Sequence, residues 1–141
     1  DIKTNLGDNY AREVKINELK ETSDIISLHT NLNQSSRHII DKQFIDDCKK
    51  SFCLINTARG ECVSNHDLIY GLESGKIIGA GLDVLENENK DFEGIVIDQN
   101  LDKLKKFENV ILTPHTAGWS NESKVKLAQI TVNKIKEFLD L

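Results

Sequence analysis

The stretch that most constrains the fold is residues 52–60, Phe-Cys-Leu-Ile-Asn-Thr-Ala-Arg-Gly, where a short apolar run stops at polar residues, an arginine and a glycine. Such a run, bounded by residues typical of turns, predicts a buried strand whose end is exposed. Arg59 would then lie just past the carboxyl end of that strand. In open parallel sheets this edge binds ligands, and a planar guanidinium suits a carboxylate. The alternative, a solvated arginine or one paired with a neighbouring acid, stays open.

The rest of the chain alternates between predicted strands and predicted helices. Residues 1–15 read as a loop, and strands are expected at 24–29, 52–56, 77–85 and 110–113. Helices are expected at 16–20, 41–50, 64–75, 101–107 and 120–141, the third capped by Ser64 at its start and Gly75 at its end, the last with an apolar stripe. This alternation predicts parallel βαβ units in a single α/β domain.

Three ionisable residues follow three different predicted strands. Arg59, Glu88 and His115 each come shortly after a strand ends, so a parallel sheet would bring them to one crevice. With Glu88 as a neighbour, His115 would be an acid/base whose charged form is favoured. The alternative is that His115 is only a hydrogen-bonded loop residue.

Composition narrows the classes of partner and compartment. The formal net charge of -5 argues against nucleic-acid binding, which needs a basic face. No apolar run approaches the roughly 20 residues of a membrane span, and no export leader is recognisable. Three cysteines without a CxxC pair predict reduced thiols and no metal site. We therefore expect a cytoplasmic protein that binds neither membrane nor nucleic acid.

Several motifs, taken in order, carry a family resemblance. They are residues 23–29 (SDIISLH), 56–60 (NTARG), 74–77 (SGKI), 79–86 (GAGLDVLE) and 112–117 (LTPHTA). Together they resemble the D-isomer-specific 2-hydroxyacid dehydrogenases over about residues 16–141. The acidic segment from Asn87 to Lys106 resembles the D-lactate and D-hydroxyisocaproate branch more than the phosphoglycerate branch, which has a shorter connection there. The resemblance implies a Rossmann-like, doubly wound parallel sheet, of which this chain is the second half.

The same resemblance implies an enzyme that reduces 2-oxo acids to D-2-hydroxy acids with NADH. In that family Arg59 would bind the substrate carboxylate and His115 would exchange the hydroxyl proton. Glu88 would orient the histidine. Both Asn31, where the family usually has proline, and the pair at 118–119 depart from the lactate enzymes, so the particular substrate is left open.

Other residues are implied to contact the cofactor. Asp83 would hold the nicotinamide carboxamide, and Thr57 and Ala58 would line the nicotinamide. His29 is placed on the cofactor side, and Asp1 would hold the adenosine ribose. Residues 79–84 begin like a dinucleotide fingerprint, but they lack the third small residue and lie within a predicted strand, so they are not a phosphate loop.

The glycine-rich phosphate loop and the substrate domain of the family are absent from these residues. We therefore expect residues 1–141 to be a partial NAD-binding domain, inactive alone, from a protein that forms homodimers through this domain. Two alternatives remain. One is an NAD(H)-sensing interaction protein of the corepressor type, which keeps similar motifs. The other is a non-catalytic dimerisation fragment.

Overall fold

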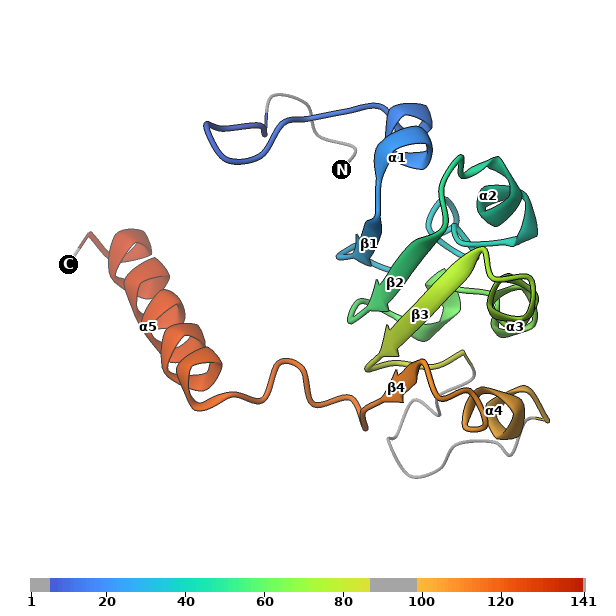
Figure 1. Cartoon of the computed structure of the whole chain (residues 1–141). Coiled ribbons are helices and arrows are strands. Elements are labelled where there is room, and N and C mark those ends of the chain that lie inside the picture. Colours follow the sequence, from blue (N-terminus) through green and yellow to red (C-terminus); the bar gives the residue numbers. More distant parts are fainter. Residues whose placement is uncertain (1–5, 87–98, 141) are drawn as a thin grey trace.

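The computed structural model describes residues 6–86 and 99–140, which form a parallel sheet with helices along one face (Figure 1). The sheet has four strands in the order β1-β2-β3-β4, all paired in parallel. Its strands are β1 (Ile25–Leu28), β2 (Phe52–Asn56), β3 (Ile77–Leu82) and β4 (Val110–Leu112). The helices are α1 (Ile16–Thr22), α2 (Lys42–Asp47), α3 (Asn65–Glu73), α4 (Gln99–Leu104) and α5 (Asn121–Phe138), with a 3₁₀ turn η1 (Gly60–Cys62). The predicted parallel α/β architecture is confirmed.

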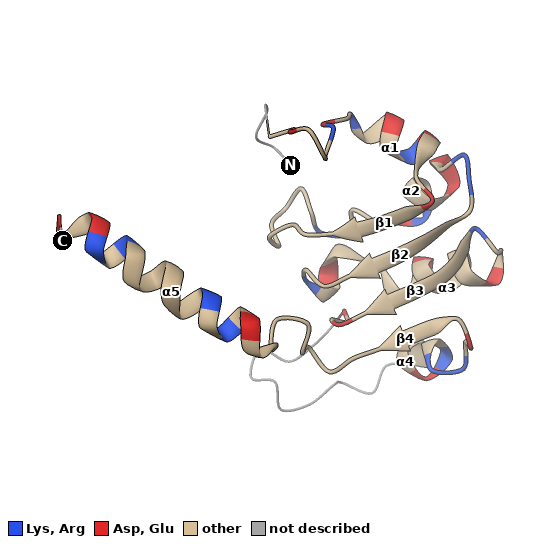
Figure 2. Ribbon diagram, turned by 60° about the vertical axis from the view of Figure 1, so that its left-hand side comes forward, with Lys and Arg blue, Asp and Glu red and all other residues tan. Residues whose placement is uncertain are grey.

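One face of the sheet packs against helices to form the hydrophobic core. Alternate strand residues point toward α2, α3 and α4, which lie on this side of the sheet (Figure 1). Phe52 and Leu54 of β2 are fully buried there, together with Ile45 of α2, Leu68 of α3 and Leu104 of α4. The four strands contain no charged residue, and Figure 2 shows them uncoloured while charges lie on the helices and loops. Burial of this apolar face against the helices therefore stabilises the sheet.

The opposite face of the sheet is open. Ile25, Ile55, Ile78 and Ile111, one from each strand, are 62%, 37%, 54% and 69% exposed. Helix α5 does not cover them: it extends away from the sheet, and none of its residues is buried (Figure 1). The apolar stripe predicted for this helix is thus present in the sequence and exposed in the structure. Parallel sheets are normally covered on both faces.

Most predicted boundaries agree with the structure to within a few residues. Ser64 caps α3 by accepting a hydrogen bond from the Asp67 amide, and Gly75 follows the helix with φ 70°, as expected of a C-terminal glycine. Two expectations were wrong. Helix α2 ends at Asp47, so the lysines at 49–50 lie beyond its last turn. Strand β3 ends at Leu82, and the side chain of the next residue, Asp83, binds the segment after β4.

No helix within residues 6–86 and 99–140 is long and apolar enough to cross a membrane.

Candidate functional site

The carboxyl ends of the four strands are level with one another. Leu28 pairs with Asn56, Asn56 with Leu82, and Leu82 with Leu112. The residues that follow these four positions therefore leave the sheet at the same edge. This is the edge at which open parallel sheets bind ligands.

The turn that carries Arg59 is built by the side chain of Asn56, which is 1% exposed. Its Oδ1 accepts a hydrogen bond of 3.1 Å from the Ala58 amide, and its Nδ2 donates one of 3.0 Å to the Arg59 carbonyl. Asparagine commonly stabilises turns in this way. The guanidinium Nη1 donates to the Ala58 carbonyl at 2.6 Å, and the Arg59 side chain is otherwise exposed beyond the sheet. Arg59 is thus held at the edge while its charge stays accessible.

Asp83 organises the segment that follows β4. Its carboxylate is buried and accepts three hydrogen bonds, from the Thr113 hydroxyl at 2.6 Å, the Thr116 amide at 2.8 Å and the Ala117 amide at 2.9 Å. Burial alone would raise the pKa of the Asp83 carboxyl, but these hydrogen bonds outweigh it and lower the pKa. A charged carboxylate therefore fixes the loop on both sides of His115.

His115 lies in the middle of this loop with a left-handed backbone, φ 54°. Its amide donates to the carbonyl oxygens of Asp83, at 2.9 Å, and Thr113, at 3.0 Å. Histidine is one of the residues that enter this region more readily, but the conformation still has a cost that the surrounding hydrogen bonds must offset. The backbone of His115 is therefore bonded directly to the residue that follows β3.

The structure brings most of the predicted site residues to the same edge: Arg59, His115, Asp83, the exposed Thr57 and, at the far side, His29. Ala58 is 7% exposed and lies in the buried part of the turn. Glu88 and Asp1 lie outside the described residues.

His29 follows β1 at this edge, at its far side, because β1 is the edge strand next to β2. Its Nε2 lies 2.9 Å from the Ser27 hydroxyl, and both residues are exposed.

Sequence reasoning missed the residues that support the site. Asn56 was visible as a polar residue at a strand end, a position where asparagine often bonds nearby backbone. The roles of Thr113 and Thr116 had no such signal, because their partner is Asp83, about 30 residues away along the chain.

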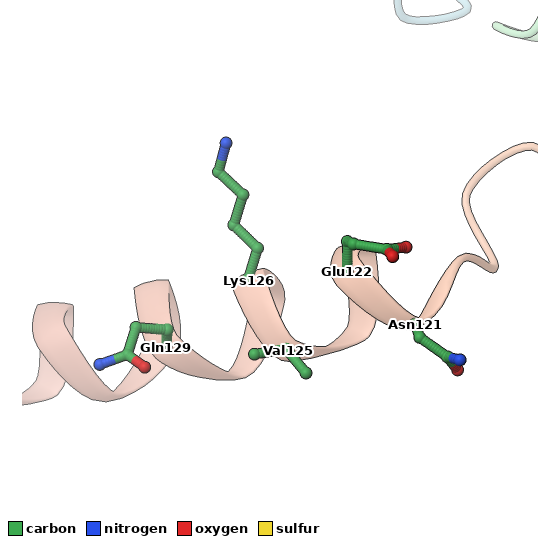
Figure 3. Close-up of a pocket in the computed structure, with 5 residues that line it drawn as sticks. All are labelled: Asn121, Glu122, Val125, Lys126 and Gln129. Carbon is green, nitrogen blue, oxygen red and sulfur yellow. The ribbon is translucent and has the colours of Figure 1, made fainter.

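Two other features lie away from this edge. A shallow pocket is lined by Asn121, Glu122, Val125, Lys126 and Gln129, all from α5, and Figure 3 shows these side chains projecting from one helix without enclosing a space. It has no geometry for chemistry. Among residues 6–86 and 99–140 there is no group of three or more His, Cys, Asp and Glu side chains that could hold a metal ion.

The donor set at the strand ends fits one end of a dinucleotide. Thr57 is exposed beyond β2, and the exposed Arg59 and the half-buried His115 lie on turns that follow β2 and β4. These groups suit a nicotinamide and a carboxylic acid beside it. A glycine-rich loop for the pyrophosphate is absent from the sequence.

Comparison with known proteins agrees with this geometry. Residues 2–117 match the family described as D-isomer specific 2-hydroxyacid dehydrogenase, NAD binding domain. The chain is 37% identical over 134 residues to an aromatic 2-oxoacid reductase of Clostridium sporogenes, covering 92% of this chain and 40% of that protein. It is 35% identical over 127 residues to a D-lactate dehydrogenase of Staphylococcus aureus, covering 84% of this chain and 37% of that protein.

The fold is similar to solved structures as well. The NAD-complexed D-isomer specific 2-hydroxyacid dehydrogenase of Lactobacillus delbrueckii ssp. bulgaricus gives a TM-score of 0.76 at 34% identity, with 90% of this chain and 40% of that chain covered. The chain thus spans about 40% of the length of the relatives it matches. It belongs to the NAD-binding-domain family of the D-isomer-specific 2-hydroxyacid dehydrogenases.

Proposed function

We propose that this chain is the second half of the NAD-binding domain of an enzyme that reduces 2-oxo acids to D-2-hydroxy acids. The observation that carries the proposal is the level ending of β2, β3 and β4, which brings Arg59, Asp83 and the His115 loop to one edge. A cation for the carboxylate and an imidazole for the proton are the two groups that reduction of a 2-oxo acid requires besides a hydride donor.

Each residue has a distinct role in this proposal. Arg59 binds the substrate carboxylate through two parallel hydrogen bonds and so orients the carbonyl. His115, as imidazolium, transfers its proton to the carbonyl oxygen, which becomes the hydroxyl. Glu88 orients that imidazole. NADH, when bound, supplies the hydride to the carbonyl carbon. Asp83 holds the His115 loop and, at the same edge, would approach the nicotinamide carboxamide.

Most of the remaining residues proposed to contact the cofactor lie along the carboxyl edge of the sheet. Thr57 and Ala58 would line the nicotinamide, and the exposed His29 lies beyond them toward β1, on the side proposed for the rest of the cofactor. Asp1 is proposed to hold the adenosine ribose. The acceptor is a 2-oxo acid, and the names of the relatives include both lactate and aromatic substrates.

The test is NADH oxidation by the full-length protein with a panel of 2-oxo acids, including pyruvate and phenylpyruvate, and identification of the product enantiomer. Turnover with formation of the D-hydroxy acid is expected. Tight NADH binding without turnover of any 2-oxo acid would instead favour the NAD(H)-sensing protein.

The open face of the sheet and helix α5 expose apolar surface that further protein would cover. Ile78 and Ile111 are more than half exposed there, and the apolar side chains of α5 are exposed too. Exposed apolar surface of this extent typically marks an interaction surface. We therefore infer that further residues of the same protein, or its second subunit in a homodimer, cover these surfaces. Sedimentation of the full-length protein would test the dimer.

The net charge and the cysteines support what we propose about partners and cellular compartment. The net charge of -5 disfavours nucleic acid as a partner. All three cysteines are free thiols, and Cys48 and Cys62 are buried. Free thiols suit a reducing compartment, in keeping with a cytoplasmic enzyme.

A further inference from the structure

Glu86 connects three segments near the candidate site. Its Oε1 lies 2.6 Å from Nε2 of His38, and its Oε2 accepts a hydrogen bond of 2.9 Å from the amide of Asn65, the first residue of α3. Because a carboxylate only accepts, Nε2 of His38 carries the proton in this pair. The Glu86 side chain is 19% exposed and the His38 side chain 41%. Both carboxylate oxygens are thus engaged, one with an imidazole and one with a helix amide.

Gly60, next to Arg59, packs directly against the same segment. A Cβ at position 60 would lie 1.8 Å from the carbonyl oxygen of Leu85 and 2.6 Å from the amide nitrogen of Glu86. The backbone that follows Arg59 therefore touches the backbone that carries Glu86. A change in the position of Glu86 would be transmitted to the Arg59 turn.

The segment that carries His38 is bonded to the Arg59 turn as well. The His38 amide donates to the Glu61 carbonyl at 2.8 Å, and the Ile40 amide donates to the Cys62 carbonyl at 3.1 Å. His38 itself has a left-handed backbone, φ 49°. Residues 38–40 and 60–62 are thus hydrogen-bonded to each other, and the His38–Glu86 contact joins them to the segment that follows β3.

We propose that Glu86 and His38 are positioning residues for the carboxylate anchor Arg59. The inference rests on the proposed function. Glu86 holds the segment after Asp83 against Gly60, and His38 holds Glu86 from the other side. Neither residue touches the substrate, and their joint effect is to fix where the Arg59 guanidinium stands relative to the His115 loop.

The experiment measures KM for the 2-oxo acid, kcat and NADH affinity in the full-length protein. Glu86→Gln keeps an oxygen for the Asn65 amide but no longer offers a carboxylate to His38. His38→Asn is too short to reach Glu86, whereas His38→Gln places an amide donor near the position of Nε2. We expect Glu86→Gln and His38→Asn each to raise KM by about tenfold or more, as for a misplaced binding group, with NADH affinity within about twofold of wild type.

The pair of substitutions at position 38 separates positioning from backbone support. Asparagine tolerates a left-handed backbone better than glutamine does. If His38 only supports the backbone, His38→Asn should have a KM closer to wild type than His38→Gln. If His38 positions Glu86, His38→Gln should have the KM closer to wild type. The double variant of His38→Asn and Glu86→Gln should have a KM no higher than the worse single variant.

His66→Asn is the matched control, because His66 also contacts a carboxylate, that of Asp67 at 2.9 Å, in the first turn of α3, but is 83% exposed. It should leave KM unchanged. An active wild type with unchanged KM in the Glu86 and His38 variants, or with additive effects, overturns this inference alone. A wild type that reduces no 2-oxo acid overturns the proposed function and this inference with it.

Discussion

The hydroxyl of Thr113 donates a hydrogen bond of 2.6 Å to the carboxylate of Asp83, which is 4% exposed. With the amides of Thr116 and Ala117 on the same carboxylate, this contact joins the end of β3 to the loop after β4. His115 lies within that loop. A single buried side chain thus holds the loop that carries the proposed proton donor.

Replacing Asp83 by asparagine should destabilise the fold. An amide offers one acceptor oxygen where the carboxylate offers two, so one of the three donors is left unsatisfied beside an amide N–H. The expected loss in the free energy of unfolding is about 1–3 kcal/mol, measured by urea denaturation. Asp102→Asn is the control, because that carboxylate is 62% exposed and its Lys105 contact is 3.9 Å long. If the two variants unfolded at the same urea concentration, the role given to Asp83 would be contradicted.

The same carboxylate should contribute to acid sensitivity. The pKa of Asp83 is lowered in the folded protein, against the effect of its burial, by hydrogen bonds from Thr113, Ala117 and Thr116. Its contribution is therefore complete above the ordinary value of 3.8 and is lost as pH falls through the lower folded pKa. The difference in stability between wild type and Asp83→Asn should shrink on acidification below that value. A difference that stays constant with pH would show that charge on Asp83 is not what stabilises the loop.

Local patterns in the sequence predicted most of the fold. The apolar run at 52–56 and the cap at Ser64 depend on neighbouring residues, and both appear where expected. The relation between Asp83 and Thr113 spans 30 residues, and no local periodicity encodes it. For the same reason the sequence placed His38 only beside a polar loop, although its partner is Glu86, in the segment that follows β3.

The exposed surfaces show a second limit of sequence reasoning. The pattern of α5 predicted an amphipathic helix, and the helix is present, but an apolar stripe does not say what it packs against. The same holds for Ile111 and the other isoleucines on the open face of the sheet. Their alternation predicts strands but does not say what covers them.

Replacing Arg59 by lysine should weaken use of the 2-oxo acid in the full-length protein. An ammonium is a point charge and cannot reproduce the planar, two-bond fork of a guanidinium on a carboxylate. We expect kcat/KM to fall by about ten- to a hundredfold, mostly through KM. Arg37→Lys, at another exposed arginine, is the control. Normal kinetics in Arg59→Lys would exclude this arginine as the carboxylate anchor.

Residues 1–141 alone should bind NADH weakly. They supply the edge proposed for the nicotinamide but contain no glycine-rich loop for the pyrophosphate. Calorimetric titration of the isolated chain should give a Kd well above about 10 µM, a value that corresponds to roughly 7 kcal/mol of binding. Tighter binding than this would mean that the main cofactor contacts lie within the chain and have been wrongly placed.

Replacing His115 by glutamine should affect the chemical step more than binding. Glutamine can still donate a hydrogen bond to the substrate carbonyl, but it cannot transfer a proton, so kcat should fall by roughly a hundredfold or more. NADH affinity should stay close to wild type, because the loop is held by Asp83 through Thr113 and backbone amides that the substitution leaves in place. Stopped-flow measurement of NADH oxidation in the full-length protein separates the two quantities. His66→Gln, at a histidine whose side chain is 83% exposed, should retain full activity. Normal turnover in His115→Gln would assign the proton transfer to another group and remove the mechanism proposed for this edge of the sheet.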